Sequence, residues 1–215
     1  MSGVEKSKKN NKNSAWSFKV DTVNAYAYWE KAFTPEECDK IIKIGKDKGL
    51  DKAGVIGKSE LDIRSSQITW LVPDDLEWVY RRITDMVLNL NDRFFQFDVY
   101  GITEQLQFTN YKAPSDNYGK HVDKAQNFPV RKLSVSIQLT DPKKYKGGEL
   151  YLYDNEEGVE MKKEQGDLIL FPSYTLHEVK PVTKGERNSL VAWVTGKQFR
   201  WVLNIKLLKK LFHMN

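Results

Sequence analysis

Residues 166–196 read GDLILFPSYTLHEVKPVTKGERNSLVAWVTG and hold three short runs rich in branched and aromatic apolar residues. Turn-forming residues separate these runs, and none of the runs has helical spacing, so each one predicts a β-strand. Similar runs lie upstream at residues 97–111, 131–141 and 147–154. Many short strands without helices between them predict a sandwich or a barrel-like pair of sheets.

Two helices are predicted before this β-rich part. Residues 34–49, TPEECDKIIKIGKDKG, start with a capping box between Thr34 and Glu37 and end at a glycine. Residues 73–95 have apolar side chains at helical spacing, and residues 63–72 between the helices read as a strand. The apolar residues that recur in the second helix are Leu76, Val79, Tyr80, Ile83, Val87 and Leu90. We expect the two helices to cover one face of a sheet.

Composition and charge argue against several classes of protein. The sequence has 215 residues and a single cysteine, Cys38, so no disulfide can form within the chain. It has no apolar run of membrane-spanning length and no signal core in its polar N-terminus, so we expect a cytoplasmic protein. The net charge is +5, but the basic clusters lie at the two ends, at residues 6–12 and 206–212. We interpret these as a solvated tail and an amphipathic end, so nucleic acid is not a favoured partner.

A candidate metal site lies in residues 111–124, YKAPSDNYGKHVDK. Alternate side chains of a strand share a face, so His121 and Asp123 point the same way. The pattern alone is weak, because chance produces it in roughly one in five sequences with this many histidines and aspartates. His177, on another predicted strand, can supply a third ligand. Two imidazoles and one carboxylate suit Fe(II) or Mn(II) with open coordination positions, whereas a structural zinc site needs a fourth ligand.

Arg187 heads the last predicted strand, ten residues beyond His177. Its apolar neighbours on that strand predict that the guanidinium is at least partly buried. A buried guanidinium requires a partner, and its geometry matches a carboxylate. The partner is either an Asp or Glu of the protein or the far carboxylate of a dicarboxylic co-substrate whose other end chelates the metal. The sequence leaves both interpretations open.

The order of HVD, His177, Arg187 and Trp193 resembles that of the Fe(II)/2-oxoglutarate-dependent oxygenases, in particular the prolyl hydroxylase group. The resemblance covers about residues 60–196, including GGEL and the HEVKPVTKGER run. It implies that Fe(II) is held by the triad His121, Asp123 and His177. It also implies a double-stranded β-helix fold, also called a jelly roll or cupin-like fold, of the mainly β class with flanking N-terminal helices.

The same resemblance implies roles for further residues. For the co-substrate 2-oxoglutarate they are Arg187, Tyr111, Gln138 and Leu150. For the substrate they are Tyr118, Arg131 and Trp193. At the position of Gln138, some relatives have a tyrosine that bonds the carboxylate of the co-substrate. Gln138 could donate the same kind of hydrogen bond, but the substitution leaves that contact open.

One strand face and one turn are informative without the resemblance. On residues 131–139, Ser134, Ser136 and Gln138 form a polar face inside an otherwise apolar sheet, which indicates that this face lines a pocket. We interpret the pair of glycines at 147–148 as a hairpin turn.

The predicted organisation is a flexible tail (1–14) and a single oxygenase domain (15–215). Within the domain we expect helical support at about 34–95, a β-helix core at about 97–196 and an extension at 197–215. The resemblance implies Fe(II), with 2-oxoglutarate and O2 as co-substrates and ascorbate as a candidate reductant.

The activity implied is hydroxylation of a C–H bond, with release of succinate and CO2. The expected target is a prolyl residue of a protein or peptide. Two alternatives stay open. One is the same chemistry on a free amino acid, a lipid or a nucleobase. The other is a non-catalytic β-sandwich binding module whose histidines are structural. The oligomeric state is not set by any pattern in the sequence.

Overall fold

The structure is a computed structural model that describes residues 22–53, 64–123 and 129–198. The predicted tail at 1–14, the basic clusters at both ends and residues 199–215 of the predicted extension lie outside the described residues. No helix in the described part of the chain is both long enough and apolar enough to cross a membrane.

The described residues form two main helices and a set of mostly short strands, as the sequence predicts. In chain order the elements are β1 (Ala27–Trp29), α1 (Pro35–Asp47), β2 (Asp51–Lys52), β3 (Arg64–Ser65), β4 (Gln67–Leu71), α2 (Pro73–Leu90), the π-helix η2 (Asn91–Phe95), β5 (Val99–Ile102), β6 (Leu106–Lys112), β7 (Asn117–His121), β8 (Arg131–Gln138), the 3-10 helix η3 (Pro142–Lys144), β9 (Lys146–Gly147), β10 (Leu150–Tyr153), β11 (Val159–Glu160), β12 (Leu168–Pro172), β13 (Leu176–Val179), β14 (Val182–Lys184) and β15 (Glu186–Gly196).

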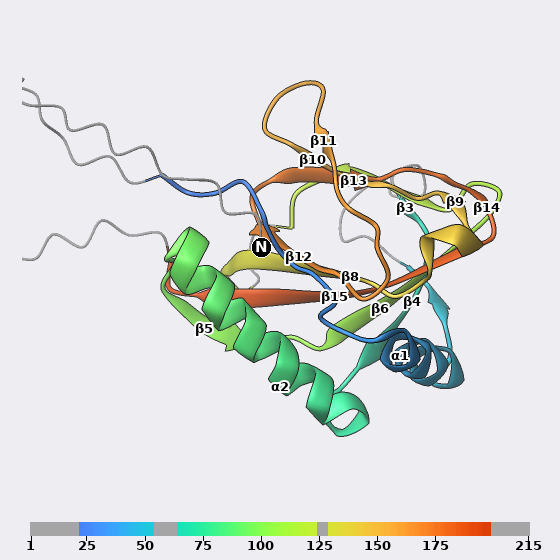
Figure 1. Cartoon of the computed structure of the whole chain (residues 1–215), viewed down its shortest axis with the longest axis horizontal. Helices are drawn as coiled ribbons and strands as arrows, with labels where there is room; N and C mark the ends of the chain where they lie inside the picture. The colour runs from blue at the N-terminus through green and yellow to red at the C-terminus, as the bar shows by residue number, and fades with distance from the viewer. Residues whose placement is uncertain (1–21, 54–63, 124–128, 199–215) are drawn as a thin grey trace, which may run out of the picture.

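Two facing sheets and a helical layer make up the architecture. The major sheet has the order β1-β12-β8-β15-β6-β4-β2, with β5 also paired to β15. The minor sheet has the order β11-β10-β13-β7-β3. Figure 1 shows the minor sheet on one side of the major sheet and helices α1 and α2 on the other. Chain neighbours mostly alternate between the sheets, which is the jelly-roll arrangement expected from the sequence.

Helix α1 begins as its sequence predicts. Thr34 Oγ1 accepts from the backbone N–H of Glu37, and the Glu37 carboxylate accepts from the N–H of Thr34, at 3.3 and 3.0 Å. This reciprocal pair satisfies two of the amide groups that a helix start leaves without partners. Glu37 also forms a two-bond ion pair with Arg82 of α2, so the cap ties the two helices together.

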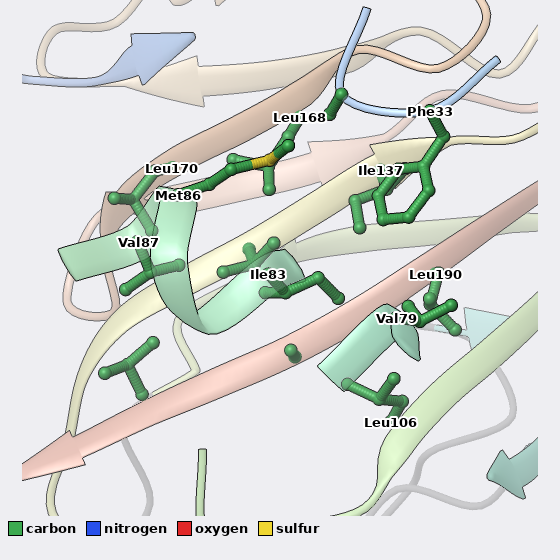
Figure 2. Close-up of a cluster of buried hydrophobic side chains, with 14 of the residues drawn as sticks. Phe33, Val79, Ile83, Met86, Val87, Leu106, Ile137, Leu168, Leu170 and Leu190 are labelled. Carbon is green, nitrogen blue, oxygen red and sulfur yellow. The ribbon is translucent and has the colours of Figure 1, made fainter. Parts of the chain in front are cut away.

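Helix α2 and the outer face of the major sheet enclose the larger hydrophobic core. The predicted apolar stripe of α2 is buried, except that Tyr80 is half-buried and donates its hydroxyl to the carbonyl of Leu71. Figure 2 shows how these side chains meet those of the sheet strands. The residues labelled there are Phe33, Val79, Ile83, Met86, Val87, Leu106, Ile137, Leu168, Leu170 and Leu190. Burial of this apolar surface holds α2 against the major sheet.

A second, smaller core lies between the two sheets. Its buried members come from both, as with Phe171 of β12 and Leu152 of β10. One sequence interpretation was wrong here. The pair Gly147 and Gly148 is not a hairpin turn, because β9 pairs with β14 whereas β10 pairs with β11 and β13. The two glycines carry the chain from the two-stranded sheet of β9 and β14 to β10 of the minor sheet, and both have positive φ angles, of 76° and 68°.

Candidate metal centre and co-substrate pocket

Three candidate metal ligands converge between the sheets. His121 ends β7 and lies directly opposite His177 of β13 in the antiparallel ladder. Asp123 follows β7 by two residues. One potential ligand atom from each of the three lies within 4.8 Å of the others, and no second such group occurs in the described part of the chain. The strand pairing, which the sequence does not specify, brings together residues that are more than fifty positions apart.

Hydrogen bonds orient both imidazoles. His121 Nδ1 lies 2.8 Å from the carbonyl oxygen of Gly119, and His177 Nδ1 lies 2.9 Å from that of Thr175. A carbonyl only accepts, so each Nδ1 carries a proton, and in a neutral ring Nε2 then has a free lone pair. The two Nε2 atoms lie 3.7 and 3.6 Å from the oxygens of Asp123. Both lone pairs are therefore aimed at the space beside the carboxylate.

The pKa values of His121 and Asp123 are both lowered, which favours the protonation states that bind a cation. Burial and the neighbouring His177 lower the pKa of His121 to about 4, so its imidazole is neutral near pH 7. Burial alone would raise the pKa of Asp123, but the two histidines and a hydrogen bond from Ser134 outweigh it and lower that pKa. Two imidazoles and one carboxylate with open positions beside them are the donor set that suits non-haem Fe(II). The residues present therefore fit the ion.

The triad opens into a cavity of about 620 Å³ between the sheets. A cavity of this size can hold a small diacid beside the metal and one side chain of a larger molecule. Every site residue predicted from the sequence lines it, except Gln138. Ser134 and Ser136 also line it, as their polar strand face predicted.

Arg187 lies in the same cavity and is almost fully buried, with 1% of its surface exposed. Its Nη2 donates to Gln138 Oε1 at 2.9 Å and its Nη1 to Ser189 Oγ at 3.4 Å, and both acceptors are neutral. Its Nε has no hydrogen-bond partner among the described residues, and no described carboxylate pairs with it. An isolated buried cation is strongly unfavourable, so this group calls for an anion from outside the chain.

The surroundings of Arg187 fit the carbon chain of a diacid. The ring of Tyr111 lies beneath the guanidinium, with 5.3 Å between the guanidinium carbon and the ring centre, and buried Leu150 lines the same cavity. Gln138 lies behind Arg187, where it orients the guanidinium. Gly148 leaves room for the arginine, because a Cβ at that position would lie 2.9 Å from Arg187 Cδ.

The three predicted substrate residues lie close to the triad. The ring of Tyr118 stacks on His121 with centroids 3.5 Å apart, and burial raises its pKa to about 12. Arg131 lies over the ring of Trp193 at 3.9 Å, and the indole N–H of Trp193 acts with Ser134 to lower the pKa of Asp123.

Sequence reasoning missed other lining residues, which come from distant elements. They are Arg64, Trp70, Glu104 and Gln107, among others. No spacing relates them to the ligands, and only the sheet order brings them to the cavity.

Comparisons with known proteins support the same interpretation. The model of the 2OG-Fe(II) oxygenase superfamily matches residues 106–195, which contain the triad and Arg187. The PKHD-type hydroxylase YbiX of Shigella dysenteriae serotype 1 is 30% identical over 161 residues, covering 71% of this chain and 69% of that protein. This chain belongs to the 2OG-Fe(II) oxygenase superfamily.

Other relatives of this chain match over shorter lengths. The PKHD-type hydroxylase of Aliarcobacter butzleri is 40% identical over 94 residues, which cover 40% of this chain and 42% of that protein. The one from Nitrosomonas europaea is 32% identical over 114 residues, covering half of each protein. The chain thus spans about half the length of these two curated relatives.

Solved structures share the fold of this chain. A prolyl-4-hydroxylase from Pseudomonas putida matches with a TM-score of 0.65 at 19% identity, covering 81% of this chain and 94% of that one. A prolyl hydroxylase from Trichoplax adhaerens, solved with a fragment of hypoxia inducible factor, matches with a TM-score of 0.68 at 19% identity, covering 80% and 84%. Enzymes of this superfamily use Fe(II), 2-oxoglutarate and O2, and the triad with Arg187 fits the first two.

Proposed function

We propose that this chain is an Fe(II)- and 2-oxoglutarate-dependent dioxygenase that hydroxylates a prolyl residue in a protein or peptide. The balanced reaction converts 2-oxoglutarate, O2 and a substrate C–H bond into succinate, CO2 and a C–OH group. The observation that carries the proposal is Arg187, a buried cation without an anionic partner among the described residues, in the cavity that the metal triad also lines. A diacid that binds both features matches 2-oxoglutarate.

Each residue of the site has a defined task in this reaction. His121, Asp123 and His177 would hold the metal, which supplies the O2-dependent oxidation when it is bound. Arg187 binds the far carboxylate of 2-oxoglutarate through its free Nε–H and the Nη groups, and Gln138 holds the guanidinium plane in place. Binding at both ends fixes the orientation of the co-substrate.

The remaining wall excludes water and receives the substrate. Tyr111 and Leu150 cover the carbon chain of the co-substrate with apolar surface. Tyr118, Trp193 and Trp70 form an aromatic border on the side of the triad, and the ring centres of Trp70 and Trp193 are 6.1 Å apart. Aromatic faces suit a pyrrolidine ring. These features support a prolyl peptide as the substrate.

We also propose that the chain works in a reducing compartment inside the cell. Cys38 is a buried free thiol whose pKa burial raises to about 12, so it is held as an inert thiol. A single thiol is compatible with a reducing compartment.

The test is formation of succinate and of an oxygenated product. The purified chain is incubated with Fe(II), 2-oxoglutarate, O2 and a library of proline-containing peptides. We expect succinate, and a peptide whose mass rises by one oxygen located on proline. His177→Ala should abolish both, whereas Glu77→Gln, on the exposed face of α2, should leave both unchanged. Turnover that persists in His177→Ala, or succinate whose yield never responds to any peptide, contradicts the proposal.

A further inference from the structure

Asp123 differs from the two histidines in how its backbone is held. His121 and His177 are paired with each other in the ladder of β7 and β13, so strand pairing fixes both. Asp123 lies beyond the end of β7 and takes part in no ladder. A metal ligand must be held within a fraction of an ångström of its productive position, so other contacts have to hold this residue.

Three hydrogen bonds to β8 and to the turn after β12 hold Asp123. Its N–H donates to the carbonyl oxygen of Ser173 at 3.0 Å, and its own carbonyl oxygen accepts from Arg131 Nη1 at 3.1 Å. Its carboxylate Oδ2 accepts from the hydroxyl of Ser134 at 2.6 Å. The amide, the carbonyl and the side chain of one residue are thus each bound by a different partner from β8 or the turn after β12.

Two of these partners are held in turn by further contacts. Ser134 is 1% exposed, and its Oγ lies 3.0 Å from the hydroxyl of Ser173, which is fully buried. The guanidinium of Arg131 forms a two-bond ion pair with Glu104, with Nε to Oε1 at 2.7 Å and Nη2 to Oε2 at 2.5 Å. The same guanidinium lies 3.9 Å over Trp193. Ion pair, aromatic ring and carbonyl together leave Arg131 a single orientation.

We propose that Glu104, Arg131 and Ser134 are positioning residues for Asp123 and thereby set the affinity of the metal site. This inference rests on the proposed function, because it takes the triad to be a metal site. It also gives Arg131 a role other than the substrate contact that the family resemblance implies. The charge of Arg131 is neutralised by Glu104, and three of its five N–H groups already have acceptors, which leaves two for a substrate.

Binding of Mn²⁺ to the chain without 2-oxoglutarate tests the inference, because it needs no turnover. The affinity is measured by calorimetry for the wild type, Ser134→Ala, Glu104→Gln, Arg131→Met and the double variant Glu104→Gln/Arg131→Met. Loss of a hydrogen-bonded partner behind a metal ligand weakens metal binding about 10- to 100-fold. We expect Ser134→Ala and Arg131→Met to fall in this range, and Glu104→Gln to weaken binding about tenfold or less.

The double variant tests whether Glu104 acts through Arg131. If it does, Glu104→Gln adds nothing to the loss already caused by Arg131→Met. The matched control is Glu37→Gln, which breaks another two-bond Arg–Glu pair whose arginine also lies over aromatic rings, but far from the cavity. Its Mn²⁺ affinity should stay within about twofold of the wild type.

The outcomes separate the inference from the proposed function. If the wild type binds Mn²⁺ and all three single variants bind it equally well, the inference is wrong. If those variants instead raise only the KM for a peptide, Glu104 and Arg131 are substrate contacts. If the wild type binds no Mn²⁺, the metal site itself is absent and the proposed function fails as well. If Ser134→Ala fails to fold, Arg131→Met and Glu104→Gln still decide the question, because both of these side chains are partly exposed.

Discussion

Replacing Arg187 by methionine should have opposite effects on the stability of the chain and on its affinity for 2-oxoglutarate. The guanidinium is buried and has only neutral partners among the described residues. Removing an uncompensated buried charge relieves a desolvation penalty of several kcal/mol, whereas leaving Gln138 Oε1 without its donor costs about 1–3 kcal/mol. The methionine side chain fills most of the space that the arginine stem occupies beside Gly148, so no large cavity forms. The free variant should be as stable as the wild type or up to about 3 kcal/mol more stable.

The affinity for 2-oxoglutarate should fall in the same variant. Truncating one partner of a buried, hydrogen-bonded charge pair costs about 2–5 kcal/mol, which corresponds to roughly 30- to 4,000-fold weaker binding. Binding of Mn²⁺ should not change, because Arg187 does not contact the triad.

Thermal denaturation with Mn²⁺, with and without 2-oxoglutarate, measures both effects. For a chain of this size about 1 kcal/mol shifts Tm by about 2–4 °C. The wild type should gain Tm on adding 2-oxoglutarate, and Arg187→Met should not. Arg82→Met is the matched control. It removes an arginine that does have a carboxylate partner, Glu37, and should lower Tm without affecting the gain. If Arg187→Met loses stability and keeps the full gain with 2-oxoglutarate, then Arg187 is a structural residue and the reasoning is refuted.

Three further predictions concern the site and its support. His121→Ala should abolish succinate formation and Mn²⁺ binding while the circular dichroism spectrum stays that of the wild type; retained binding would remove this residue from the triad. Gly148→Ala should raise the KM for 2-oxoglutarate with little change in Mn²⁺ affinity, because the new Cβ would meet Arg187 Cδ and the backbone has a φ of 68°. An unchanged KM would show that Arg187 shifts to accept the Cβ without any loss of co-substrate binding. Glu37→Gln should lower Tm at pH 7 but not at pH 2–3. The hydrogen bonds from Arg82 hold the pKa of Glu37 below its usual value against partial burial, so its stabilisation is present above the unfolded pKa and is lost as the pH falls through the folded one. A deficit in Tm that is the same at both pH values would contradict that assignment.

The sequence predicted those parts of the fold that depend on local chemistry. Thr34 and Glu37 predicted the start of α1, because a capping box is satisfied within one turn. The period-2 pattern of residues 131–138 predicted one apolar and one polar face for β8, and Ser134 and Ser136 do line the cavity. Gln138 continues this pattern but lies behind Arg187, because the strand leaves the cavity before its last residue.

The sequence did not predict what depends on pairing between distant strands. β8 lies between β12 and β15, an order that no local signal specifies. The same order brings Glu104 and Arg64 to the cavity from segments that the sequence did not mark as functional. The pair Gly147–Gly148 read as a hairpin, since positive φ angles serve equally in a tight turn and in a passage between sheets. The role of Gly148 beside Arg187 follows only from the fold.

The central claim is that one ferrous ion and one diacid occupy this cavity together, held by the triad and by Arg187. An anaerobic titration of the chain with Fe(II) and 2-oxoglutarate tests it most directly, since chelation of Fe(II) by an α-keto acid gives a visible charge-transfer absorption. The account predicts that this absorption appears with one equivalent of Fe(II), is absent in His177→Ala, and needs far more 2-oxoglutarate in Arg187→Met. A chain that binds Fe(II) and 2-oxoglutarate without this absorption, or that shows it equally in His177→Ala, would contradict the account.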